Sequence, residues 1–468
     1  MPHTLRCLVL SCLAIAALPA AVLASGFQLI EQNGSGLGYA FAGQAAGVKD
    51  ASAIYFNPAA LTRLDGRQFV IAVDPVGIHS KFSDTSSSRP SLPGLALPVP
   101  AGSSGGNAGG WTPVPNGYVS WQVQSRTWLG LGVNVPFGLK TEWDGDWMGR
   151  FHAVKSDVHT INLNPTLAVK VSDRLSLGAG ISYQRLEAEL TQNLPYGGIA
   201  FGAAASLGGP AAAAGIMTQL GANGLAREGD CVIEGNDWSW GWNAGALLRV
   251  AEEGSLAVSY RSKVRHALEG DASFHGAPTF VTLGPLAALG AGLNSRFATG
   301  PVTASIELPD TFSAAAAYET DRLELLADWT WTGWSSIQEL AVARADGSAL
   351  STVPLRFEDT WRAGAGVGYW IRDTWKIRLG VAYDKSPVQD QYRTPRLPDA
   401  DRTWAAAGFQ KRIGAKGALD LGYAHLFIDD ASSNLPNQSA AGTPPVGTLA
   451  GSYSSKVDVF SIQYRLSF

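Results

Sequence analysis

The chain has 468 residues, of which only 16% are Asp, Glu, Lys or Arg, and its formal net charge is −4. No basic stripe accompanies this balance, so the sequence does not support nucleic-acid binding and we expect no nucleic-acid partner. The 54 glycines and 10% aromatic residues, against only 3 methionines, favour strands and turns over a helical core.

The N-terminus resembles an export signal. Arg6 precedes the apolar run "CLVLSCLAIAALPAAVLA", and Val22-Leu23-Ala24 fits a cleavage site for small residues. We therefore expect residues 1–24 to be a signal peptide. A membrane anchor is a weaker alternative because the apolar run is short, and a lipoprotein is weaker because the run continues well past Cys12. Cleavage would leave a single cysteine, so we expect no disulfide framework and no cysteine metal site.

Residues 25–66 do not alternate apolar and polar side chains, and they end in "YFNPAAL" at 55–61. Small residues, as in "GSGLG" and "AGQAAG", would let this segment pack closely against other backbone. Pro58 suits a turn because its ring fixes one backbone angle. Asn57 can both donate and accept hydrogen bonds. A simple turn before the first strand explains the same residues, and the sequence alone leaves both interpretations open.

Residues 67–468 show period-two alternation, as in "TWKIRLGVAYDK", where apolar residues at 375–383 alternate with Lys376, Arg378 and small residues. The strands run to about 10–16 residues, and short polar turns alternate with long connections, which is typical of outer-membrane barrels. The fold class is therefore all-β, an antiparallel transmembrane barrel of about 14 strands. A soluble sandwich would have shorter strands. The terminal Phe468 matches the C-terminal signature of barrels assembled into the bacterial outer membrane.

Two of the long connections contain apolar segments, 209–224 and 280–295, that we predict to form short helices. They either cap the barrel or form an apolar landing surface at its mouth. In the third strand, "WLGLGVNVPFGLK", Pro136 cannot donate to a sheet ladder and Gly138 contributes little packing. This pattern indicates either a break within the strand or its end at Val135.

Catalytic and metal-binding motifs are weak. "GSGLGYA" has no preceding strand, "DGDW" lacks the later ligands of a calcium loop, and the seven histidines show no ligand spacing. No Gly-x-Ser-x-Gly elbow is present. We expect no enzyme activity, no metal and no cofactor, with an outer-membrane lipase as a weak alternative.

Several short motifs occur in order along the mature chain: "SGFQL" at 25–29, "NPA" at 57–59, "VPFGLKTEW" at 135–143, "GRFHAVKS" at 149–156, "INLNPTLAVKVSDRLSLGAG" at 161–180, "LPDTFS" at 308–313, "GVAYDKSPV" at 380–388 and "LPDADRTW" at 397–404. Together they resemble the bacterial outer-membrane long-chain fatty acid transporters and their aromatic-hydrocarbon relatives (FadL/TodX, OMPP1 type). The resemblance implies that residues 25–66 are a hatch inside a barrel formed by 67–468.

The resemblance also implies the site residues. Asn57, Pro58 and Ala59 would belong to the hatch and face an inward kink of strand three at Pro136, Phe137 and Gly138, which makes a side opening. Phe27 and Leu29, near the mature N-terminus, would contact ligand. No cation follows the strand that ends in "LTQNL", so the carboxylate partner is not evident. Arg378 is the predicted candidate, with Lys376, Arg261 and Lys263 as other possibilities.

From this resemblance we expect passive uptake of hydrophobic molecules, with long-chain fatty acids as the first candidate cargo and toluene-like monoaromatic hydrocarbons as the alternative. A general porin is a weaker alternative because it would not need a hatch. The expected partners are the hydrophobic cargo, outer-membrane lipid and lipopolysaccharide, and the barrel-assembly machinery, and the expected state is a monomer.

Overall fold

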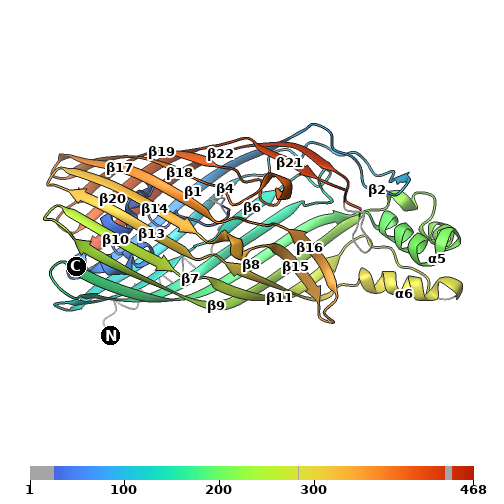
Figure 1. Ribbon diagram of the computed structural model, residues 1–468, viewed down its shortest axis with the longest axis horizontal. Helices are drawn as coiled ribbons and strands as arrows, with labels where there is room; N and C mark the ends of the chain where they lie inside the picture. Colours follow the sequence, from blue (N-terminus) through green and yellow to red (C-terminus); the bar gives the residue numbers. More distant parts are fainter. Residues whose placement is uncertain (1–25, 283, 438–444) are drawn as a thin grey trace.

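The computed structural model describes residues 26–282, 284–437 and 445–468, so the predicted signal peptide lies outside the described residues. One closed antiparallel sheet forms the body of the molecule (Figure 1). Strand β1 (Arg67–Asp84) is hydrogen bonded both to β22 (Leu449–Ser467) and to β4 (Trp111–Gln124), so the first and last strands meet. Because the first and last strands pair with each other, neither of them is an open edge of the sheet, which is the condition for a sheet to cross a lipid bilayer.

The sheet contains twenty segments, and six of its spans are each broken into two, so the barrel has fourteen spanning strands, as predicted. The remaining segments are β5 (Thr127–Asn134), β6 (Gly138–Glu142), β7 (Lys155–Lys170), β8 (Leu175–Leu194), β9 (Gly229–Arg249), β10 (Gly254–Arg261), β11 (Val264–Phe274), β12 (Gly300–Leu308), β13 (Thr311–Glu319), β14 (Leu323–Thr332), β15 (Glu339–Arg344), β16 (Ala349–Pro354), β17 (Thr360–Arg372), β18 (Trp375–Asp384), β19 (Arg402–Ile413), β20 (Gly417–Ile428) and β21 (Ala431–Leu435). A separate small hairpin pairs β2 (Ser91–Leu92) with β3 (Leu95–Ala96).

The alternation of side chains along the strands separates an apolar exterior from a polar interior. On β18, Leu379 and Val381 are 55% and 58% exposed, whereas Lys376 and Arg378 on the other face are 4% and 3% exposed. A soluble sandwich would bury the apolar face instead. The apolar outer face confirms the predicted transmembrane barrel, whose exterior contacts lipid.

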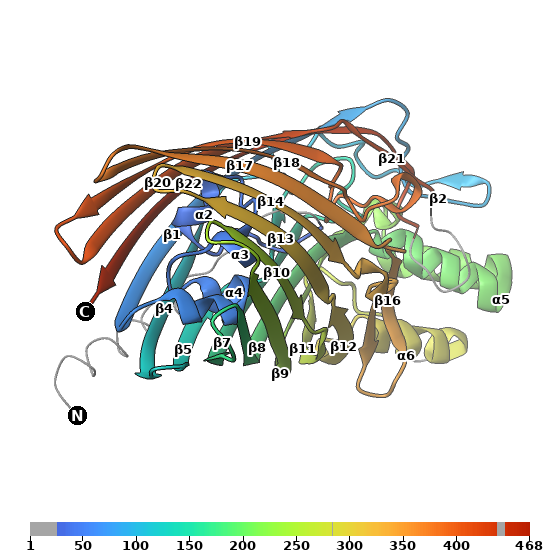
Figure 2. The ribbon, with the colours of Figure 1, turned by 60° about the vertical axis from the view of Figure 1, so that its left-hand side comes forward.

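The N-terminal segment, residues 26–66, lies inside the barrel (Figure 2). It contains α2 (Gly34–Leu37), α3 (Gln44–Gly47), α4 (Ala53–Phe56) and the 3₁₀ helix η2 (Pro58–Arg63). Helix α2 contacts β19, β20 and β22, α3 contacts β10 and β13, and η2 contacts β7, β8 and β9, so the segment reaches across the lumen. Glycines permit the closest approach: a Cβ added to Gly38 would lie 2.6 Å from the Cα of Gly408.

The long connections gather at the end of the barrel opposite Phe468 (Figure 1). Here α5 (Tyr196–Leu220) packs against α6 (Ala287–Arg296), in the two connections where helices were predicted. Helix α5 begins earlier than expected and has a kink at Gly209, where φ is +66°. It is long and apolar enough to cross a membrane by composition alone, but it lies beyond the barrel strands (Figure 1).

Residues 336–356, which the turn pattern of the sequence places in a long connection, are largely strand. β15 pairs with β16 as a hairpin and also with β12, so the wall extends further on this side than the turn pattern suggested. Pairing with β12 decides this outcome, because a short hairpin gains stability only from neighbouring strands.

Candidate functional site

The third spanning strand is broken where the sequence places Pro136. β5 ends at Asn134 and β6 begins at Gly138, and both segments pair with β7, so the strand continues past the break. β4 follows β5 only as far as the Gly117–Val133 pair, and β6 has no ladder with β4 among the described residues. The two sides meet again where the backbone N–H of Glu142 donates to the carbonyl of Ala108, 2.9 Å away. The wall therefore has a gap between β4 and β6.

The beginning of the N-terminal segment seals this gap from inside. The backbone N–H of Leu29 donates to the carbonyl of Pro136 (2.8 Å), and the N–H of Gly138 donates to the carbonyl of Phe27 (2.9 Å). The side chain of Gln32 donates to the carbonyl of Val135 (2.7 Å). The segment thus supplies the hydrogen-bond partners that β4 does not supply, which buried backbone groups require.

An aromatic cluster covers the same contact. The ring centroid of Phe27 lies 5.8 Å from that of Phe137 and 5.1 Å from that of Trp334, and all three side chains are buried. Trp334, from a 3₁₀ turn after β14, was not identified from the sequence, because only the fold brings it beside the break. Phe27 and Leu29, which were predicted to contact ligand, therefore lie at the break itself.

Asn57, Pro58 and Ala59 lie at the start of η2, against β8 and β9. Asn57 Oδ1 accepts from the N–H of Ala59 (3.1 Å), and Asn57 Nδ2 donates to the carbonyls of Ala45 (2.8 Å) and Ala246 (3.2 Å). Its described hydrogen bonds therefore hold the segment to β9, whereas the segment's beginning contacts the break. Wall glycines allow this fit, since a Cβ at Gly178 would lie 2.5 Å from the backbone N of Ala59.

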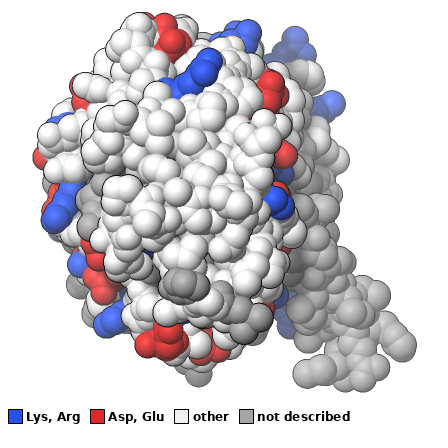
Figure 3. Space-filling view, turned by 90° about the vertical axis from the view of Figure 1, so that its right-hand side faces the viewer, with Lys and Arg blue, Asp and Glu red and all other residues white. Residues whose placement is uncertain are grey.

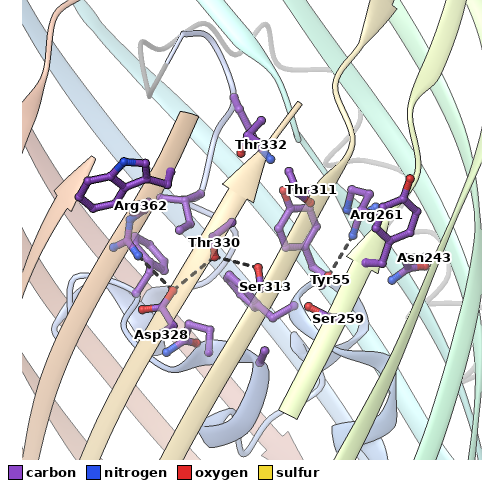
Figure 4. A pocket seen from close by; sticks show the side chains of 18 of the residues that line it. Tyr55, Asn243, Ser259, Arg261, Thr311, Ser313, Asp328, Thr330, Thr332 and Arg362 are labelled. Carbon is purple, nitrogen blue, oxygen red and sulfur yellow. Dashed lines mark hydrogen bonds and ion pairs between the residues drawn. The ribbon is translucent and has the colours of Figure 1, made fainter. Parts of the chain in front are cut away.

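A cavity of about 900 Å³, part of it open to solvent, lies between the N-terminal segment and the wall formed by β9, β10, β13, β14 and β17 (Figure 4). Its charged groups have partners. Arg261 donates to the carbonyl of Tyr55 (3.0 Å) and to Ser182, and Arg362 forms an ion pair with Asp328 (3.3 Å). This cavity has both polar and apolar lining and lies directly beside the segment that seals the gap.

A larger groove of about 1480 Å³, also partly open, lies at the long-loop end of the barrel. Apolar side chains from loops, strands and α5 form most of its lining: Phe151, Leu194, Ile199, Ile233, Phe274, Phe297, Leu350, Val353, Leu435 and Val446. The face above it, which carries α5 and α6, shows few charged side chains across its centre (Figure 3). An apolar groove beneath an apolar face is suited to a hydrophobic ligand.

The groove also contains nitrogen-bearing side chains that the sequence did not single out. Arg396 is 8% exposed, and burial lowers its pKa to about 10, so it is charged at neutral pH. Burial lowers the pKa of His152 to about 4, so its ring is neutral there. Arg396 follows "YRTP" in a loop and lies outside the motif that begins at Leu397, which explains why only the fold reveals its position.

The predicted carboxylate partner, Arg378, lies elsewhere. Its Nη1 is 2.5 Å from Asp420 and its guanidinium stacks over the ring of Tyr39, at the short-turn end of the lumen. Lys376 pairs with Glu324 (2.9 Å) beside it. Lys263 is exposed and pairs with Glu307, so it does not face the lumen cavity. Of the four predicted cations, only Arg261 lines the cavity.

Metal ligands are not grouped in the described part of the chain, where no cluster of three or more His, Cys, Asp or Glu side chains could hold an ion. The one cysteine within it, Cys231, is buried in the groove wall.

Comparison with known proteins gives consistent matches over nearly the whole chain. The family model described as "Outer membrane protein transport protein (OMPP1/FadL/TodX)" matches residues 15–468. The long-chain fatty acid transport protein of Escherichia coli K12 is 28% identical over 421 residues, which cover 88% of this chain and 90% of that protein.

Among solved structures, a FadL homologue from Pseudomonas aeruginosa is 28% identical with a TM-score of 0.81, covering 95% of this chain and all of that one. The toluene transporter TbuX of Ralstonia pickettii is 18% identical with a TM-score of 0.64, covering 94% of this chain and all of that one. At 18% identity the second likeness concerns the fold alone.

Proposed function

The chain belongs to the OMPP1/FadL/TodX family of outer membrane transport proteins, and on this premise we propose that it takes up long-chain fatty acids and releases them sideways through its wall. The family consists of transporters of hydrophobic compounds and not of enzymes. The observation that carries the lateral route is the gap between β4 and β6, sealed by the beginning of the N-terminal segment. In this proposal residues 25–66 act as a hatch.

The proposed path has three stages. The apolar groove at the outer end captures the molecule, which the polar lipopolysaccharide layer would otherwise exclude. Each buried CH₂ contributes about 0.8 kcal/mol to this binding. The ligand then enters the lumen cavity, the hatch residues 27–32 leave the break, and the chain passes between β4 and β6 into the membrane. No step requires a cofactor or an energy source, because partition into lipid favours release.

A reversible staple tests the lateral route. Gln28 and Phe137 face each other in an isolated antiparallel bridge whose flanking hydrogen bonds join Leu29 to Pro136 and Gly138 to Phe27. Such a pair has Cα atoms about 4.5 Å apart, within the range that a disulfide spans. The double variant Gln28→Cys/Phe137→Cys should therefore form a disulfide that fixes the hatch on the break.

We expect the oxidised double variant to lose uptake of radiolabelled oleate in cells that lack their own fatty acid transporter, and to regain it on reduction. The two single-cysteine variants serve as controls, because they carry the same side-chain losses without the staple. Uptake that is equal in the oxidised and reduced double variant would refute release through this gap.

Uptake of monoaromatic hydrocarbons is the second candidate, and the cluster of Phe27, Phe137 and Trp334 at the break is the observation that favours it. Aromatic rings of a ligand would pack on these side chains. Parallel uptake assays with labelled oleate and toluene separate the two. Transport of toluene alone would assign the protein to the aromatic branch.

The family and the barrel support a proposal for the partners and the oligomeric state. We propose that lipopolysaccharide surrounds the outer half, that the barrel-assembly machinery inserts the chain, and that the protein acts as a monomer. A closed barrel with its own hatch requires no second copy to complete the path.

A further inference from the structure

The groove at the outer end contains a buried cation, Arg396, that forms no ion pair with a carboxylate among the described residues. Two arginines, Arg296 and Arg396, line it, whereas its described lining contains no Asp or Glu side chain. His152 in the same wall is neutral at physiological pH. An uncharged hydrocarbon would gain nothing from guanidinium groups, whose burial costs free energy unless an anion accompanies them. The charge of the groove therefore indicates an anionic amphiphile.

Arg396 is the better placed of the two groups. Its Nη1 donates to the carbonyl of Lys155 (3.2 Å) and to Ser156 Oγ (3.1 Å), and its Nη2 donates to Gln192 Oε1 (2.9 Å). All three acceptors are neutral, and no described carboxylate lies within 4.0 Å of its guanidinium. Arg296, by contrast, has an interaction of its own at the end of α6.

The backbone around Arg396 is held in position. Thr141 Oγ1 donates to the carbonyl of Arg396 (3.1 Å), and Trp143 Nε1 donates to the carbonyl of Pro395 (3.0 Å). Thr141 belongs to β6, the strand on one side of the gap, so Arg396 stands between the groove and that strand. A guanidinium fixed in this way loses little freedom when it binds a carboxylate.

We infer that Arg396 binds the carboxylate of a fatty acid whose acyl chain lies on the apolar lining of the groove. This inference rests on the proposed function, which it makes specific: the residue selects ionised fatty acids over neutral hydrocarbons. The sequence-based candidate Arg378 does not fill this role in the groove, because it is paired with Asp420 in another part of the lumen.

A purely structural role for Arg396 makes a different prediction. Its bonds to Lys155, Ser156 and Gln192 join β7 and β8 to the loop between β18 and β19, so removing them could disturb the groove as a whole. That damage would weaken binding of charged and neutral ligands alike. Loss of a carboxylate contact would weaken only the binding of the charged ligand.

The test compares oleate with oleyl alcohol, which has the same chain and an uncharged head group, on purified protein in lipid nanodiscs at pH 8. Empty nanodiscs correct for partition into lipid. Arg396→Gln removes the charge and keeps much of the size, Arg396→Lys keeps the charge, and Arg227→Gln is the matched control, because Arg227 is exposed and does not line the groove.

We expect Arg396→Gln to weaken oleate binding by about 10- to 100-fold, the usual effect of losing hydrogen bonds to a charged group, and to leave oleyl alcohol binding unchanged. Arg396→Lys should recover part of the loss, and Arg227→Gln should match the wild type. Equal oleate affinity in Arg396→Gln and wild type, or equal weakening for both ligands, would overturn the assignment while leaving fatty acid uptake standing. A wild-type protein that binds neither ligand would instead refute the proposed function.

Discussion

Replacing Asn57 with alanine is expected to loosen the N-terminal segment, the proposed hatch, without unfolding the barrel. Asn57 is fully buried, caps η2 through Oδ1, and donates through Nδ2 to the carbonyls of Ala45 and Ala246. Loss of an N-cap costs about 1 kcal/mol, and each buried carbonyl left without its donor costs about 1 kcal/mol more. The sum is about 3 kcal/mol of local stability, which corresponds to roughly a hundredfold change in the opening equilibrium.

Hydrogen–deuterium exchange followed by mass spectrometry measures this directly. Amides of residues 44–63 in Asn57→Ala should exchange roughly a hundredfold faster than in the wild type, whereas strand amides of β18 and β19 keep their rates. Asn57→Asp separates the two effects, because it retains the acceptor for Ala59 but cannot donate to Ala45 or Ala246. Wild-type exchange in Asn57→Asp would refute the argument that the bond to β9 holds the hatch.

Three further outcomes are expected. Gly178→Ala should displace η2 and speed amide exchange at 53–63, because the added Cβ would lie 2.5 Å from the backbone N of Ala59. The expected cost in stability is about 1–3 kcal/mol. Gly300→Ala is the control and should have no effect, because no heavy atom lies within 4 Å of its added Cβ. Glu324→Gln should make residues 34–49 sensitive to limited proteolysis, because it leaves the buried Lys376 without its anion. Breaking such a buried ion pair costs about 3–5 kcal/mol of stability. Unchanged resistance to the protease would contradict a structural role for this pair. In a planar bilayer the wild type should show no large open conductance, because the N-terminal segment crosses the lumen, and a stable porin-like current would refute that arrangement.

The sequence by itself determined the barrel. Alternation with period two is a local property that each strand displays independently, so residues such as Leu379 and Arg378 reveal which face meets lipid and which faces the lumen. The count of about fourteen followed from turns and long connections, and the structure confirms it. The sequence also placed the strand-three irregularity, because Pro136 cannot donate to a ladder wherever the chain runs.

Only the tertiary structure decided what this irregularity does. Whether the strand ends at Val135 or continues depends on its pairing with β7, and the gap depends on β4 failing to follow it. The sealing of the gap by Phe27 and Leu29 joins residues more than a hundred positions apart, which no local pattern encodes. The contact of Asn57 with the wall is equally hidden from the sequence. Its partner is the backbone carbonyl of Ala246, and a backbone carbonyl leaves no signature in the sequence.

The charge of the groove shows this limit most clearly. Arg378 and Arg396 are both arginines in the last quarter of the chain. The strand alternation around Arg378 predicts the face on which it lies, but the sequence around neither arginine shows which groups the fold places opposite it. Arg378 forms an ion pair with Asp420, so its charge is neutralised, whereas Arg396 donates only to neutral oxygens among the described residues, beside an apolar groove. A charge acquires its function from what the fold places opposite it, and that depends on contacts between distant segments of the chain.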